Sequence, residues 1–115
     1  SAMTPNPFQQ CIDLCYACAA ACNQCASACL SEPHADAMTQ CIRLDIECAE
    51  ICTLAASTMA REGAFSAEVC GVCAKVCDAC AAVCEKHEAD HCQRCAAACR
   101  ACAEACRSMY AGQSS

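Results

Sequence analysis

Apolar positions recur along most of the chain at alternating steps of three and four residues, and cysteine occupies nearly every one of them. Such steps return to one face of an α-helix, whereas in a strand they would scatter the side chains over both faces of a sheet. The pattern therefore predicts helices that each turn a cysteine-lined face, at a and d positions, toward a bundle core. The four groups are Cys11, Cys15, Cys18, Cys22, Cys25 and Cys29; Cys41, Cys48 and Cys52; Cys70, Cys73, Cys77, Cys80 and Cys84; and Cys92, Cys95, Cys99, Cys102 and Cys106.

Residues that begin or end helices divide the chain into four segments. Asn6, followed by proline, is typical of a helix start, and Pro33 ends the first segment. Gly63 is a predicted C-cap, and Asp90 with Gln93 resembles a capping box. We expect helices over residues 7–31, 34–61, 67–87 and 91–110. Their short connections favour antiparallel neighbours, so the prediction is an all-α, antiparallel up-down four-helix bundle forming one domain over residues 1–115.

The composition shows that large aliphatic side chains cannot fill this core. The 115 residues include 19 cysteines and 27 alanines, but only 14 Leu, Ile, Val and Phe residues together. Abundant alanine with three glycines and three prolines favours helix, which leaves cysteine to occupy the interior. A net charge of −6 offers no basic patch for nucleic acid, and no uncharged apolar stretch is long enough to cross a membrane.

The N-terminal residues bear on the cellular compartment, which in turn decides whether the cysteines form disulfides. Ser1 and Ala2 precede Met3 and resemble a remnant of recombinant expression, so they are left out of the fold prediction. No basic segment followed by an apolar stretch comes next, so we expect a cytoplasmic protein, where disulfides are rare. Cysteines on one helix face also point the same way, and their total is odd, which argues against a disulfide scaffold.

The unbroken rows of thiols indicate metal binding. One or two buried cysteines serve as ordinary core residues, but sixteen consecutive stripe positions in three helices need a chemical reason. Structural zinc uses discrete sites with four ligands, and iron–sulfur clusters use other spacings. Cu(I) prefers thiolate and accepts two or three ligands, so bridging thiolates would hold multiple Cu(I) ions per chain along the bundle axis.

Histidine and methionine extend the thiol rows at the ends of the predicted helices. On the second helix the same spacing passes through His34 and Met38, and an antiparallel bundle brings these residues to the end that carries His87 and His91. Imidazole and thioether are suitable Cu(I) ligands, so we expect all four to take part in metal binding or transfer at this end. At the opposite end we expect an apolar plug formed by Phe8, Met59, Phe65 and Met109.

Asp45 occupies a stripe position between Cys41 and Cys48. A carboxylate is a hard ligand that suits Cu(I) poorly, which favours a partly buried acid paired with a base such as Arg43. The alternative is an auxiliary oxygen ligand to the metal.

Three segments make the chain recognisable: residues 41–48, the turn at 87–92 and residues 102–109. With them the chain resembles the cytosolic bacterial copper storage proteins, four-helix bundles that load many Cu(I) ions into a cysteine-lined core. The resemblance implies copper storage, a homotetramer and metal held mainly by inward-facing thiolates. A copper chaperone is a possible donor.

Two other functions stay open. Zinc or general heavy-metal sequestration would use the same thiols. A thiol redox sensor would need a few partly exposed cysteines of low pKa rather than a buried array. No nucleophile–histidine–acid arrangement, phosphate loop or dinucleotide motif suggests an enzyme.

Overall fold

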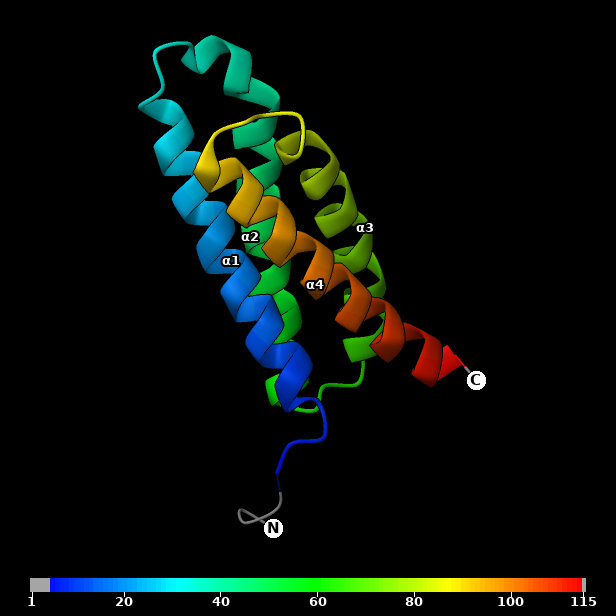
Figure 1. The fold of residues 1–115 in the computed structure, drawn as a ribbon. Coiled ribbons are helices and arrows are strands. Elements are labelled where there is room, and N and C mark those ends of the chain that lie inside the picture. The colour runs from blue at the N-terminus through cyan, green and yellow to red at the C-terminus, as the bar shows by residue number, and fades with distance from the viewer. Residues whose placement is uncertain (1–4, 115) are drawn as a thin grey trace.

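The computed structural model describes residues 5–114, and within them it contains four α-helices and one short 3₁₀-helix. Their bounds are α1 Gln9–Leu30, η1 Ala35–Met38, α2 Thr39–Ala60, α3 Ser66–Cys84 and α4 Asp90–Ser114. Successive helices run in opposite directions, and each packs against two neighbours, α1 on α2 and α4 and α3 on α2 and α4 (Figure 1). The predicted all-α, antiparallel four-helix bundle is confirmed. Ser1 and Ala2 lie outside the described residues.

The bundle has two chemically different ends. The segment between α1 and α2 and the loop between α3 and α4 lie at one end, and the start of α1 and the α2–α3 connection lie at the other (Figure 1). We call the first the histidine end, because His34 and His87 belong to its connections and His91 lies at the start of α4. The second is the methionine end, which carries Met59 and Met109.

Helix α1 begins at Gln9, two residues later than predicted, although Asn6 still organises its start. The Asn6 Oδ1 accepts a hydrogen bond from the Phe8 N–H at 2.8 Å. The Asn6 Nδ2 donates to the Met59 carbonyl at 3.1 Å. A single side chain therefore ties the first turn of α1 to the last turn of α2.

The predicted start of the second helix at residue 34 is wrong. Residues 35–38 form η1, and α2 begins only at Thr39. His34 is exposed and precedes both elements, so the helical spacing that placed it on the thiol row does not reach it. Pro33 restricts the backbone just before this point, which explains why a 3₁₀ turn intervenes between α1 and α2.

The end of α2 is a Schellman motif displaced by one residue from the predicted cap. The Gly63 N–H donates to the Thr58 carbonyl and the Glu62 N–H donates to the Met59 carbonyl, both at 2.9 Å. The left-handed residue is Glu62, with φ of 51°, and not Gly63. The prediction of a glycine C-cap was therefore wrong in position, although the helix does end here.

Two boundaries around the α3–α4 loop also differ from the prediction. Helix α3 ends at Cys84, three residues early, and α4 begins at Asp90, one residue early; at its far end α4 continues to Ser114. The predicted capping box is wrong, because the Asp90 carboxylate pairs with Arg94 and the Gln93 Nε2 donates to the His87 carbonyl at 2.7 Å. Gln93 thereby forms a hydrogen bond to the backbone of the α3–α4 loop instead of capping α4.

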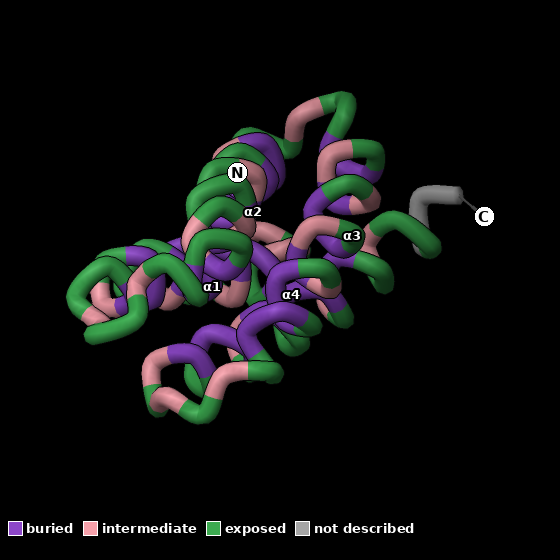
Figure 2. The backbone as a smooth tube through the Cα atoms, turned by 90° about the horizontal axis from the view of Figure 1, so that it is seen from above, coloured by how far each residue is buried: buried purple, intermediate pink, exposed green. Residues whose placement is uncertain are grey.

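Small side chains form the core, and several large apolar ones lie outside it. Eighteen cysteines have no exposed surface and Cys11 is only 6% exposed, with alanines buried beside them. The buried residues face one another across the bundle (Figure 2). By contrast Leu30, Leu54 and Val72 are about half or more exposed. Thiols and methyl groups therefore take the place that leucine and isoleucine usually hold.

We predict that the reduced, metal-free protein keeps this helical fold. Its core is already packed with neutral thiols and alanines, unlike a small zinc domain that has no core without metal. Binding of metal to the folded state alone should then raise the melting temperature further. Circular dichroism during thermal unfolding, before and after loading, measures both, and a random-coil spectrum of the reduced protein would contradict the prediction.

Candidate metal centre

The nineteen cysteines form one continuous column of sulfur along the bundle axis, which we call the sulfur column. All of them are buried free thiols. Sulfur atoms from different helices gather in groups of four, all within 4.8 Å of one another. Among these groups are Cys15, Cys73, Cys102 and Cys106; Cys18, Cys48, Cys52 and Cys77; Cys18, Cys22, Cys48 and Cys99; Cys22, Cys80, Cys95 and Cys99; and Cys25, Cys29, Cys41 and Cys92.

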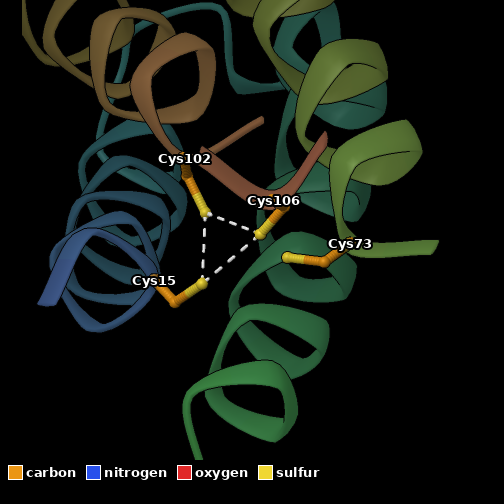
Figure 3. Close-up of side chains that lie close together, drawn as sticks. All are labelled: Cys15, Cys73, Cys102 and Cys106. Carbon is orange, nitrogen blue, oxygen red and sulfur yellow. Dashed lines mark hydrogen bonds between the residues drawn. The ribbon is translucent and has the colours of Figure 1, made fainter. Parts of the chain in front are cut away.

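One of these groups shows how three helices contribute sulfur atoms to it. Cys15 comes from α1, Cys102 and Cys106 from α4, and Cys73 points at them from α3 (Figure 3). The Sγ atom of Cys15 lies 3.5 Å from that of Cys102 and 3.6 Å from that of Cys106. A triangle of sulfur atoms with such edges is compact enough for one ion to be shared among neighbouring thiolates.

The alternating sequence steps explain why the column has no gaps. A step of four residues leaves two thiols in contact on the same helix, as between Cys48 and Cys52, whose Sγ atoms are 3.9 Å apart. The facing helix then bridges them, because Cys77 lies 3.6 Å from Cys48 and 3.5 Å from Cys52. Each sulfur therefore has neighbours along and across the bundle.

Burial opposes ionisation of these thiols in the absence of metal. It raises the pKa of Cys29 and of Cys92 above the ordinary value of a cysteine. A soft cation supplies the positive charge that a buried thiolate requires, so each ion that binds displaces protons from the column. The site thus binds metal as a thiolate array and packs as a neutral core without it.

Asp45 is fully buried within the column. Thiols donate to its Oδ1 from Cys80 at 3.2 Å, from Cys95 at 3.3 Å and from Cys84 at 3.5 Å. The expected pairing with Arg43 is wrong, because residue 43 lies two positions away on the exposed side of α2. Burial raises the pKa of the Asp45 carboxyl to about 8.

At the histidine end, His91 is the imidazole that contacts the column. Its Nε2 lies 3.5 Å from the Cys29 Sγ and 3.5 Å from a Glu32 carboxylate oxygen. His87 is half-buried in the loop after α3, and His34 is exposed. Met38 is buried at the end of η1. The histidines therefore share one end of the bundle but differ in their distance from the thiols.

The methionine end departs from the predicted apolar plug. Phe65 is 69% exposed and does not cover the end of the core. Phe8 and Met109 are partly buried and pack against the core. Met59 is fully buried, and its Sδ accepts a contact from the Cys70 Sγ at 3.5 Å. Sequence reasoning assigned Met59 to the plug, although its place in the spacing of α2 already put it in line with the thiols.

A core of this kind offers a soft metal ion a continuous set of donors. Thiolate and thioether select Cu(I), which accepts two or three ligands and can share bridging sulfurs with further ions. Eighteen of the nineteen thiols have no exposed surface, and Cys11 lies in the lining of a surface hollow.

The comparison with known families agrees with this chemistry. The profile of the copper storage protein family matches residues 4–111. The chain belongs to the copper storage protein family. It is a protein that stores Cu(I) on cysteine thiolates inside a four-helix bundle, and the buried sulfur column fits this function.

Solved structures of the family show the same fold. The Cu(I)-bound copper storage protein BsCsp3 is 49% identical, with a TM-score of 0.86 over 89% of this chain and 96% of that one. The metal-free Csp3 of Bacillus subtilis is 50% identical, with a TM-score of 0.85 over 89% of this chain and 97% of that one.

A cytosolic copper storage protein from Streptomyces lividans, holding five coppers, is 42% identical, with a TM-score of 0.88 over 91% of this chain and 92% of that one. The search of curated proteins returned no match. Between residues 5 and 114, none of the helices has the length and apolarity that a membrane span requires.

The buried carboxyl of Asp45 predicts a pH dependence of stability in the metal-free protein. Its pKa is about 8 when folded against an ordinary value of 3.8, so unfolding between these values releases a proton. Stability should therefore fall as the pH rises through this window, by up to about 1.4 kcal/mol per pH unit. The variant Asp45→Asn has no such proton to lose.

Denaturant unfolding of the reduced protein at pH 5 and pH 7 measures this effect, since most thiols stay protonated at both. We expect a larger loss of unfolding free energy in the parent than in Asp45→Asn. An equal loss in both proteins would show that the Asp45 carboxyl is already ionised in the folded state.

Proposed function

We propose that the chain stores Cu(I) at close to one ion per cysteine, with the whole sulfur column as the site. The observation that carries this proposal is the unbroken contact of nineteen buried thiols. If each thiolate bridges two ions and each ion takes two thiolates, the numbers of ions and thiolates are about equal. The ligands would be all nineteen cysteines, with Asp45 as an oxygen donor at the level where it lies among the thiols.

The competing functions fit the same observation less well. Closed zinc sites consume four thiolates for each ion and do not need contact between successive groups. A redox sensor needs a thiol that solvent can reach, whereas the most accessible cysteine, Cys11, is only 6% exposed. We therefore propose storage without catalysis.

We further propose that the protein works in the cytoplasm as a homotetramer of one-domain chains and receives copper from a chaperone. The Streptomyces lividans relative is cytosolic by its description. Assembly is supported by Ile46, Leu54 and Val72, which are 47–51% exposed and line one hollow between α2 and α3. Light scattering of the reduced protein measures the number of chains directly.

The stoichiometry is the first test of this function. Anaerobic titration with Cu(I) should saturate at roughly 19 equivalents per chain, because each thiolate is shared between two ions. Competition with a Cu(I) chelator and metal analysis after gel filtration give the count. The same titration with Zn(II) serves as the control and should stop at about four or five equivalents.

Saturation with Cu(I) at about four or five equivalents would contradict the proposal. It would indicate separate tetrahedral sites and favour general metal sequestration.

We also propose that copper enters and leaves at the histidine end. His91 lies between solvent and the Cys29 thiol, with His87, His34 and Met38 at the same end. Neutral imidazole binds a single Cu(I) ion and does not bridge two ions as a thiolate does. A histidine therefore suits the transfer of Cu(I) from a carrier.

Replacing His34, His87 and His91 together by alanine should slow loading and chelator-driven removal several-fold, with capacity nearly unchanged. Stopped-flow transfer from a Cu(I) chelator complex measures the rates. The double variant Lys86→Ala, Glu88→Ala alters exposed residues on either side of His87 and is the matched control. Unaltered rates in the triple variant would move the entrance elsewhere, and a reduced capacity would make the histidines storage ligands.

A further inference from the structure

The sulfur column does not end in a thiol at the methionine end, because the thioether of Met59 continues it. Met59 has no exposed surface, and it is the largest of the fully buried side chains. Its Sδ lies 3.5 Å from the Cys70 Sγ, which is as short as the contacts between neighbouring thiols in the middle of the column.

Cys70 has fewer thiol neighbours than a cysteine at mid-column. It interacts with the thiols of Cys106, Cys11 and Cys73. Cys48 at mid-column lies within 4.0 Å of four other thiols, which are Cys18, Cys52, Cys77 and Cys99. An ion bound at Cys70 would therefore lack part of the ligand set that ions elsewhere find, and Met59 stands where the missing donor would be.

The thioether matches this position chemically. Thioether sulfur is a soft ligand for Cu(I), like thiolate, but it carries no charge and needs no deprotonation. It can complete a coordination shell without adding a further buried negative charge at the end of the array. The Asn6 Nδ2 bond to the Met59 carbonyl holds the backbone of this residue in place.

We propose that the Sδ of Met59 is a Cu(I) ligand that forms, with the thiolate of Cys70 and that of Cys11, a mixed thioether–thiolate site closing the column. The inference rests on copper storage by the thiols. It adds a site that differs from the others in having a donor that does not bridge between ions. The competing explanation is that Met59 only fills space, as flexible methionine often does in cores.

Selenium in place of the methionine sulfur separates the two explanations. The substitutions Met3→Leu, Met38→Leu and Met109→Leu leave Met59 as the one methionine in the chain, which is then labelled as selenomethionine. Leucine and methionine have similar volumes, so these changes should cost less than about 1.5 kcal/mol each. Selenium-edge X-ray absorption of the fully loaded protein should show a copper neighbour at bonding distance.

The matched control keeps Met109 and carries Met3→Leu, Met38→Leu and Met59→Leu. Met109 is partly buried and lines a surface hollow, and among the described residues no thiol donates to its Sδ, so its selenium should have no copper neighbour. Both proteins are first assayed for total Cu(I). A full load with only carbon around the Met59 selenium overturns the inference and leaves storage intact, whereas failure to load copper at all overturns both.

A second measurement uses unlabelled protein with a single change. Met59→Leu should lose about one Cu(I) per chain at a chelator concentration that leaves the parent fully loaded, because the terminal ion has lost one of its ligands. Met109→Leu should retain the parental load. Equal retention by Met59→Leu and the parent would show that the thioether only fills space.

Discussion

Contact between buried sulfur atoms of different helices is the interaction on which this structure depends. It closes a core that has few large aliphatic side chains, and it brings the metal ligands into one array. The two roles are compatible because a neutral thiol packs as a small apolar group, while a thiolate beside a soft cation is a strong ligand. Large apolar residues such as Leu54 and Val72 can then lie on the outside of the bundle.

The sulfur column also determines the protonation state of the thiols when no metal is bound. A row of thiolates in an interior closed to solvent would be strongly disfavoured, so burial keeps thiols such as Cys29 and Cys92 protonated. Loading would exchange these protons for Cu(I). The fold is similar to that of a Cu(I)-bound and of a metal-free relative, with TM-scores of 0.86 and 0.85.

The column is chemically uneven along its length. His91 offers imidazole beside Cys29 at one end, Asp45 places a carboxyl among thiols from α2, α3 and α4, and Met59 offers a thioether beside Cys70 at the other end. Donors that do not bridge as thiolates do therefore stand at both ends. The two ends differ in the donor that they place beside the terminal thiols, which is imidazole at one end and thioether at the other.

The helices, the inward face of each and the cysteines of the sulfur column follow from the sequence, because steps of three and four residues leave only one helical face for the cysteines. The construction of the two ends depends on the folded chain. The η1 turn removed His34 from the thiol row, and Glu62 rather than Gly63 took the left-handed position. Packing between helices also gives Asp45 thiol partners in place of Arg43, and it places the Met59 sulfur next to the Cys70 sulfur. These features depend on contacts between residues from different helices or on local turn geometry. Neither can be deduced from the spacing of residues along the sequence.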